Sequence, residues 1–296
     1  MGGGLTRGLV PRASPAAWAA RARTGFVAPV FLWLGLTVAA PLALVFAVSL
    51  GESTQGAPPF EWSLTLSNYA LVFSDTLYIG AFANAARIAA TSTAICLLIG
   101  YPMAYAIARA PERKRGFLLF LVILPFWTSF LIRVYAWMAL LRPTGLINSA
   151  LQSVGLASEP LELIANEFAV HLGIVYAYLP FMVLPLYSTL ERIEGSLVEA
   201  AHDLGATPSR AFWRVTFPLS LPGVAAGCLL VFIPATGEFV IPDLLGGPDT
   251  PMIGRVMWLE FFQNRDWPVA CAIATLLAAS LALPVVIADR LRATTR

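Results

Sequence analysis

The chain contains 296 residues, and only 12% of them are charged, about half the share that is usual for a soluble domain. Hydrophobic residues make up 58% of the sequence and the mean hydropathy is +0.75, so the remaining polar residues could not cover a soluble surface. This composition excludes a soluble globular enzyme and an intrinsically disordered chain, and the net charge of +2 is too small for the basic surface of a nucleic-acid-binding protein. The chain is therefore expected to lie in a lipid bilayer.

Six stretches with few charges predict six transmembrane helices, and the expected fold class is an all-α integral membrane protein. About 20 residues at about 1.5 Å each are needed to cross the roughly 30 Å of hydrocarbon. The first stretch is too long for a signal peptide and lacks a clear cleavage site, so we expect it to remain attached. The third is interrupted only by Arg133. The predicted spans cover residues 26–50, 80–108, 116–141, 168–190, 215–237 and 267–288.

The positions of the 19 basic residues predict the orientation of these spans. With a cytoplasmic N-terminus, 14 of them fall in cytoplasmic segments and three in outer loops, while Arg87 and Arg133 fall within spans. Because Lys and Arg collect in cytoplasmic loops, both termini are expected inside. The predicted organisation is a cytoplasmic tail at 1–23, a six-span domain at 24–290 with a cytoplasmic loop at 191–214, and a cytoplasmic tail at 291–296.

The sequence offers little for bond-making chemistry. The two histidines, His171 and His202, are predicted on opposite sides of the membrane, and the three cysteines lie in different spans, so neither a metal site nor a disulfide is expected. A P-loop needs Gly-Lys followed by Ser or Thr, but the only lysine, Lys114, follows Arg113. We expect no catalytic residue, no metal and no bound cofactor in this chain. If ATP drives the protein, another subunit hydrolyses it.

The predicted cytoplasmic loop holds the most informative local pattern. Ser196 and Glu199 have the spacing of a capping box, which predicts the start of a short helix. Gly205 suits the left-handed position that follows a helix, and Thr207 with Pro208 predicts the start of another. Such a helix can dock into a groove of another protein or pack under the chain's own helices, and local physics favours neither. Its predicted apolar face consists of Leu197, Ala200, Ala201 and Leu204.

This segment resembles the EAA signature of ABC-importer membrane subunits, which reads Glu-Ala-Ala, three residues, Gly, nine residues, Ile, one residue, Leu-Pro. Here residues 199–201 are Glu-Ala-Ala and Gly205 follows after three residues. Nine residues then separate Gly205 from Val215, and one residue separates Val215 from Phe217-Pro218. The two departures, Val for Ile and Phe for Leu, are apolar replacements. In that family the loop is the coupling helix that docks into the ATPase subunit. The resemblance implies this docking role for Glu199, Ala200, Ala201, Asp203, Leu204 and Gly205.

Longer segments extend the resemblance to nearly the whole chain from about residue 26. LPFWTSFLIRVYAW at 124–137 resembles the third span of polyamine-importer permeases, and VYAYLPFM at 175–182 resembles their fourth. GEFVIP at 237–242, LLGGPD at 244–249 and NRDWP at 264–268 resemble the putrescine branch most closely, with the spermidine branch also open. The chain thus resembles a permease of the spermidine/putrescine family of ABC importers.

The resemblance implies both the fold and the partners. The expected fold is that of a type-I ABC-importer permease in the bacterial inner membrane. The implied partners are a second related permease, a pair of cytoplasmic ATPase subunits that use ATP and Mg, and a periplasmic binding protein that delivers a polyamine. ATP binding would move the coupling helices and open the kinked spans outward.

A path for a polycation needs carboxylates and aromatic faces, which hold ammonium groups by charge and by cation–π attraction. Glu238, at the outer end of the fifth span, is the first candidate; its alternative role is to pair with Arg133 or Arg87. The alternative role for each aromatic candidate is to lie at the membrane–water interface, where Trp and Tyr side chains are enriched. The other candidates for the path are Asp243, Trp127, Tyr135, Trp137, Tyr176 and Tyr178.

Arg87 and Arg133 leave the cargo open. A guanidinium that faces a central path would repel an ammonium and favour an anionic or amino-acid-like solute, whereas one with an acidic partner would be structural. A secondary carrier driven by an ion gradient is a further alternative, although such a carrier has no use for a docking helix. The sequence does not separate putrescine from spermidine, because the binding protein can set much of the selectivity.

Overall fold

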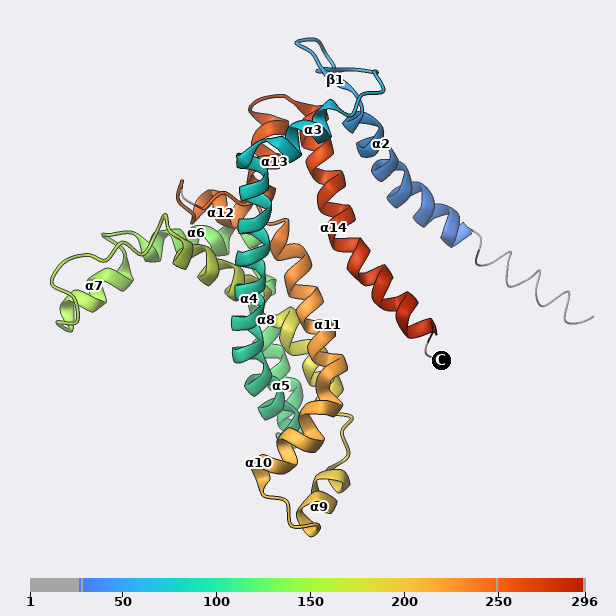
Figure 1. The fold of residues 1–296 in the computed structure, drawn as a ribbon. Helices are drawn as coiled ribbons and strands as arrows, with labels where there is room; N and C mark the ends of the chain where they lie inside the picture. The colour runs from blue at the N-terminus through green and yellow to red at the C-terminus, as the bar shows by residue number, and fades with distance from the viewer. Residues whose placement is uncertain (1–26, 28, 249, 295–296) are drawn as a thin grey trace, which may run out of the picture.

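The computed structural model describes residues 27, 29–248 and 250–294, with side-chain surroundings as far as residue 282. The predicted tail at 1–23, residues 26 and 28 of the first predicted span, residue 249 and the last two residues lie outside this part. Within it the chain is mostly helical, as predicted, with a single short β-hairpin in the described residues (Figure 1).

The elements in chain order are the π-helix η1 (Gly35–Ala39), α2 (Ala40–Ser49), β1 (Glu52–Ser53), β2 (Phe60–Glu61), α3 (Ser67–Ser74), α4 (Thr76–Arg109), α5 (Glu112–Ile123), the 3-10 helix η2 (Leu124–Trp127), α6 (Phe130–Leu141), α7 (Leu146–Ser153), α8 (Glu167–Leu190), α9 (Gly195–Asp203), α10 (Pro208–Ala211), the π-helix η3 (Phe212–Thr216), α11 (Phe217–Thr236), α12 (Val240–Leu244), α13 (Ile253–Phe262) and α14 (Trp267–Thr294).

Helices α4, α8 and α11 form the central bundle, and most of the buried apolar side chains lie between them. Small residues let these helices approach closely, as is common in membrane bundles. The fully buried Met182 of α8 lies between two glycines: a β-carbon added at Gly100 of α4 would lie 2.9 Å from its Cγ, and one at Gly227 of α11 would lie 2.7 Å from its Sδ. The three helices therefore meet where even a methyl group would force a shift.

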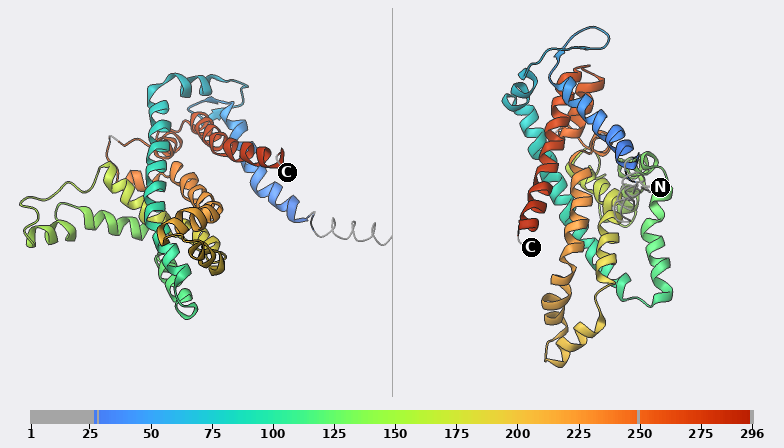
Figure 2. Two further views of the ribbon diagram at one scale, coloured as in Figure 1. Left: turned by 60° about the horizontal axis from the view of Figure 1, so that its bottom comes forward. Right: turned by 90° about the vertical axis from the view of Figure 1, so that its right-hand side faces the viewer.

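The two ends of the bundle carry different structures. At one end the antiparallel β1/β2 hairpin, α3 and α13 gather above α4, and α2 packs against α14 beside the bundle (Figures 1 and 2). At the other end α9 and α10 form a helical corner between α8 and α11 (Figure 1).

Among the described residues, five helical stretches are long and apolar enough to cross a membrane: Pro29–Ser49, Thr76–Arg109, Phe130–Ser153, Glu167–Leu190 and Pro208–Thr236. A shorter apolar stretch, Trp267–Ala282, falls within the predicted sixth span. Helix α4 has 34 residues, so it measures about 51 Å, more than even a tilted helix needs to cross roughly 30 Å of hydrocarbon. Part of α4 therefore extends beyond the hydrocarbon layer.

The structure corrects the expectation of one uninterrupted third span at 116–141. The segment is divided into α5, η2 and α6, and α6 runs crosswise to the bundle and continues into α7 (Figures 1 and 2). Pro125 has no N–H to donate to a helical hydrogen bond, and the backbone turns to extended conformation at Thr128 and Ser129, with ψ of 152° and 138°. The apolar stretch Phe130–Ser153 is likewise two helices, α6 and α7, joined by a turn.

Candidate functional site

A pocket of about 610 Å³ opens between α8, the end of α11 and the break that separates α5 from α6. Its wall brings together Tyr178, Glu238 and Arg133, which the sequence analysis had singled out in three different spans. The rest of the wall is mainly aromatic and apolar. It consists of Phe126, Thr128, Phe130, Ala177, Phe181, Pro234, Gly237, Phe239 and Val240.

Glu238 is part of this wall and is only 7% exposed. Four donors form hydrogen bonds with its carboxylate. Oε1 accepts hydrogen bonds of 2.9 to 3.4 Å from the backbone N–H groups of residues 239–241, which satisfies the first turn of α12. Oε2 accepts a hydrogen bond of 2.5 Å from the Tyr178 hydroxyl. Within the described residues the carboxylate therefore has partners other than Arg87 and Arg133, and the expected alternative pairing is corrected.

Arg133 closes the break between α5 and α6. Its Nη1 donates to the carbonyl oxygens of Pro125 and Thr128, at 2.5 and 2.7 Å. Both carbonyls belong to the segment where α-helical bonding is interrupted, so the guanidinium satisfies backbone groups that a continuous helix would have paired. The guanidinium carbon also lies 5.2 and 5.9 Å from the ring centroids of Phe126 and Phe130, within the range of cation–π contacts. Arg133 is thus a structural link that also places a positive charge on the pocket wall.

Three more of the predicted path residues have partners outside the pocket. Asp243 forms an ion pair with Arg255, whose Nε lies 3.1 Å from Oδ1. Trp137 and Tyr176 pack edge to face, with ring centroids 5.4 Å apart. The pocket wall includes none of these described side chains.

Trp127 and Tyr135 are also outside the pocket, and they are 75% and 50% exposed. Such exposure on η2 and α6 fits the interfacial role that was the alternative for each aromatic candidate. Of the seven predicted path residues, the structure therefore unites Glu238 and Tyr178.

Four phenylalanines of the pocket wall were not singled out from the sequence. They are Phe126, Phe130, Phe181 and Phe239. Each lies in a segment that carries the family resemblance and within seven residues of Arg133, Tyr178 or Glu238 in the chain, and that proximity was the available signal. A phenylalanine face attracts a cation as the indole and phenol rings of Trp and Tyr do.

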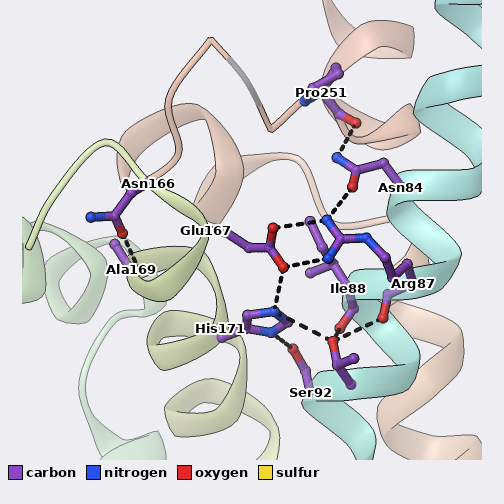
Figure 3. A network of polar contacts seen from close by, with 10 residues as sticks. Asn84, Arg87, Ile88, Ser92, Asn166, Glu167, Ala169, His171 and Pro251 are labelled. Atoms are coloured by element: carbon purple, nitrogen blue, oxygen red, sulfur yellow. Dashed lines mark hydrogen bonds and ion pairs between the residues drawn. The ribbon is translucent and has the colours of Figure 1, made fainter.

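A second polar site joins α4 to the start of α8 (Figure 3). Both terminal nitrogens of Arg87 donate to the carboxylate of Glu167, at 2.6 and 2.8 Å. His171, one turn further along α8, lies 3.1 Å from the same carboxylate through Nε2 and 2.8 Å from the Ser92 hydroxyl through Nδ1. Arg87 thus has an acidic partner, which is the arrangement expected of a structural arginine.

Asn84 extends this network to the loop before α13. Its side-chain oxygen accepts a hydrogen bond of 2.7 Å from Arg87, and its side-chain nitrogen donates one of 3.0 Å to the carbonyl of Pro251 (Figure 3). The network therefore ties together α4, α8 and a loop that lies 167 residues after Asn84 in the chain.

The helical corner at the other end of the bundle has the two predicted helices, but the first starts differently. Ser196 lies inside α9, one residue past its first position at Gly195, and its hydroxyl donates to a carboxylate oxygen of Glu194 at 3.2 Å. Among the described residues no side chain caps α9, so the predicted capping box of Ser196 and Glu199 is wrong. The spacing was right for a cap, but a serine already inside the helix cannot act as one.

The end of α9 is as predicted. Gly205 has a φ of +81°. Its N–H donates to the carbonyl of His202 at 2.8 Å, and the N–H of Ala206 donates to that of Ala201 at 2.9 Å, which is the bond pair of a Schellman motif. Thr207 then caps α10 by accepting from the N–H of Arg210.

The predicted apolar face of α9 is uncovered. All nine residues of α9 are at least partly exposed, and Leu197 and Leu204 are 46% and 90% exposed. The described part of the chain leaves this face open, so packing under its own helices does not account for it.

These features define a membrane-spanning subunit with a mainly aromatic pocket that holds a carboxylate between its helices, and with an open helical face at one end. Within the described residues, no group of three or more His, Cys, Asp or Glu side chains is placed to hold a metal ion. The chain belongs to the family described as the inner membrane component of binding-protein-dependent transport systems, which it matches over residues 10–293. It is therefore an inner-membrane permease component of an ABC importer.

Two relatives and one solved structure illustrate this membership. The chain is 42% identical to the spermidine/putrescine transport system permease protein PotB of Haemophilus influenzae over 257 residues, covering 87% of this chain and 89% of the relative. It is 38% identical to PotB of Escherichia coli (strain K12) over 255 residues, covering 86% and 92%. A chain of a bacterial ABC transporter involved in the import of the acidic polysaccharide alginate has the same fold, with a TM-score of 0.71 at 19% identity, covering 95% of this chain and all of that one.

Proposed function

We propose that the chain is the permease subunit of an ATP-driven importer that carries polyamines, putrescine or spermidine, into the cytoplasm. The observation that carries the proposal is the pocket in which the carboxylate of Glu238 lies among aromatic rings. The likeness to spermidine/putrescine permeases over most of both chains supports the same cargo class.

The pocket chemistry suits an organic ammonium group. The rings of Tyr178 and four phenylalanines offer faces that attract a cation, and Glu238 supplies a full negative charge. Backbone amides and the Tyr178 hydroxyl fix the carboxylate before any cargo arrives, so binding requires little reorganisation of this group.

Arg133 favours the second candidate, an anionic or amino-acid-like cargo, because its positive charge lies on the same wall. The anionic cargo is less favoured because the guanidinium already contacts two backbone carbonyls and two phenylalanine rings. An anion would have to compete with these contacts, whereas a cation meets rings and a carboxylate.

The open face of α9 suits the proposed contact with a cytoplasmic ATPase subunit. Leu197 and Leu204 offer exposed apolar surface, and the Schellman turn at Gly205 holds α9 at a fixed angle to α10. On this proposal the α9 end and both termini are cytoplasmic, two ATPase subunits hydrolyse ATP with Mg, and a second permease completes the pore. A periplasmic binding protein would then deliver cargo at the end that carries the β-hairpin and α13.

The test is uptake of labelled putrescine and spermidine by cells that lack polyamine importers and express this chain with its genomic neighbours for the ATPase, the second permease and the binding protein. We expect uptake that stops when ATP is depleted and that each unlabelled polyamine inhibits. Uptake that survives ATP depletion would favour a carrier driven by an ion gradient. An assembled complex that hydrolyses ATP without moving either polyamine would exclude the proposed cargo and leave the anionic solute.

A matched pair of variants tests the role of α9. Glu199→Arg places a positive charge on the proposed docking helix and should abolish uptake while the amount of inserted protein stays normal. Glu112→Arg makes the same change at an exposed position of the same end, outside α9, and should leave uptake close to wild type. Equal uptake in both variants would remove α9 from the coupling.

A further inference from the structure

A second cavity, of about 350 Å³, forms a groove between the last turns of α4 and the helix α5 that follows it. It is separate from the pocket of Glu238 and shares none of its wall residues. Phe117 and Leu121 on α5 are 63% and 45% exposed, so the surroundings of the groove are open and apolar. Its wall consists entirely of apolar side chains: Met103, Ala106, Ile107, Leu118, Leu121 and Val122.

Basic residues stand at one end of this groove. The turn from α4 to α5 exposes Arg109, Arg113 and Lys114, against one exposed acid, Glu112. The fourth basic residue of the turn, Arg115, is engaged: its Nε donates to the carbonyl of Ala110 at 2.9 Å, and its Nη1 lies 3.3 Å from Glu191. The three exposed cations thus leave a net positive charge beside the groove.

Helix geometry places Lys114 at the mouth of the groove, and Arg113 precedes it directly in the turn. Lys114 precedes Leu118 by four residues and Leu121 by seven, so the three share one face of α5. On α4, Arg109 follows Ile107 by two residues and Ala106 by three, at the end of the helix. The groove therefore runs from a basic turn into apolar surface between two helices.

We propose that this groove binds an anionic phospholipid, with one acyl chain between α4 and α5 and the phosphate beside Arg113 and Lys114. An apolar groove alone would accept any lipid, and a basic turn alone would accept any soluble phosphate. Their direct connection fits a ligand that joins an acyl chain to a negative head group. The inference concerns the folded chain in its membrane and holds whichever solute the permease carries.

The test compares phosphatidylglycerol with phosphatidylcholine, added at equal mole fraction to the purified full chain in detergent. The melting temperature and the lipids retained in native mass spectra are both measured. Phosphatidylglycerol should stabilise the wild-type chain more and be retained preferentially. Glycerol phosphate, which has the head-group charge but no chain, should have no such effect; stabilisation by it would show a site for a soluble anion instead.

Two changes address the two halves of the site. The double change Arg113→Gln with Lys114→Gln should weaken retention of phosphatidylglycerol by about tenfold or more, since each basic residue near an anionic head group contributes several-fold. Ala106→Phe, which fills the groove, should lower retention while the basic turn stays intact.

Matched controls make either result decisive. Arg142→Gln removes an exposed charge elsewhere, and Ala94→Phe adds a ring at an exposed position of α4 three turns away; both should retain the lipid as wild type does. Equal retention of the two phospholipids by the wild type would overturn the proposal. So would an Ala106→Phe chain that keeps its lipid but no longer assembles with the other importer subunits, because the groove would then belong to a partner helix.

Discussion

Arg87 and Glu167 join α4 to α8 through a two-point ion pair, with nitrogen-to-oxygen distances of 2.6 and 2.8 Å. The two side chains are 52% and 38% exposed. Because Glu167 is the first residue of α8, the pair lies at the end of that span, where a charged group is less costly than at the centre of the bilayer. Its geometry suits a structural link between helices.

Breaking this ion pair should lower the stability of the bundle modestly. Arg87→Gln and Glu167→Gln are each expected to lower the melting temperature, and a double-mutant cycle should give a coupling of about 1 kcal/mol, as is usual for partly exposed pairs. The exchange of charges, Arg87→Glu with Glu167→Arg, should recover part of the loss. A coupling near zero would mean that the two residues do not stabilise the contact between α4 and α8.

The effect of replacing Gly205 should depend on how readily the new residue adopts a positive φ, and not on the size of its side chain. A β-carbon at this position would meet no atom within 4 Å, but the φ of +81° is unfavourable for most residues. Gly205→Ala should therefore cost about 1 kcal/mol locally and reduce ATP-driven uptake, while Gly205→Asn, which adopts the left-handed region more readily, should keep more activity. Equal uptake by the two variants would show that the turn is not under conformational control.

The helical membrane-protein fold could be predicted because the apolar composition and the long stretches with few charges leave a helical bundle in a bilayer as the expected fold. The break at Pro125 could not, because α8 contains Pro180 and Pro185 and remains a single helix. What distinguishes Pro125 is the side chain of Arg133, which satisfies the carbonyls of the interrupted segment from eight residues away. That compensation depends on the folded geometry.

In the candidate site, too, some features could be predicted from the sequence and others depend on the folded geometry. Glu238 could be picked out because a carboxylate beside an apolar span is rare, but its donors could not. They are Tyr178 on α8, 60 residues earlier in the chain, and the backbone at the start of the five-residue helix α12, which no periodic pattern predicts. The partner of Arg87 lies 80 residues away in the chain. The sequence alone therefore could not decide whether Arg87 pairs with an acid or faces the path of the cargo. Family resemblance predicts the docking role of α9, and this role stays a proposal that the exposed face of α9 fits.

The contact between Gly100 and Met182 should respond to paired substitution. Gly100→Ala would bring a β-carbon to 2.9 Å from Met182 Cγ and 3.4 Å from a Val183 methyl carbon, both side-chain atoms. Met182→Ala leaves a cavity, and together with Gly100→Ala it should cost less than the sum of the two single changes.

Gly227→Ala is the matched control for this contact. Its added β-carbon would also lie 3.1 Å from the backbone oxygen of Met182, which a smaller side chain cannot relieve. Melting temperatures of the two double variants should therefore show weaker rescue for Gly227→Ala. Equal rescue at both glycines would contradict the packing described here.

Asp266 should make the stability of the protein depend on pH. It lies before α14, where burial raises the pKa of its carboxyl group and the nearby negative charge of Glu260 adds to the effect, while a hydrogen bond from the N–H of Val269 opposes it. The folded state then binds the proton more tightly than the unfolded chain, whose Asp titrates near about 3.9. The contribution of this group is most favourable at low pH and is lost as pH rises from about 4 through the folded pKa.

Asp266→Asn should therefore raise the melting temperature at neutral pH and have little effect near pH 4, because it keeps the acceptor for Val269 and removes the buried charge. Asp266→Ala removes the acceptor as well and should cost about 1 kcal/mol at every pH, as the loss of a helix cap does. Melting curves of both variants from pH 4 to pH 7.5 provide the measurement. If Asp266→Asn changes the melting temperature by the same amount at every pH, the charge of Asp266 does not destabilise the folded protein.

Two substitutions of Arg133 separate its role at the helix break from its charge on the pocket wall. Arg133→Gln removes the charge and weakens the hold on the carbonyls of Pro125 and Thr128, while Arg133→Lys keeps the charge and one strong donor group. Since hydrogen bonds to charged groups contribute about 1.5–3 kcal/mol, the folded yield should fall for both variants and further for Arg133→Gln. If the pocket holds the ammonium group as proposed, Arg133→Gln should lower the KM for putrescine by about fivefold among folded molecules, because a repulsive charge is gone. Arg133→Lys should leave the KM close to wild type. If the KM changes equally in both variants, the effect comes from the altered helix break and the charge does not act on the cargo.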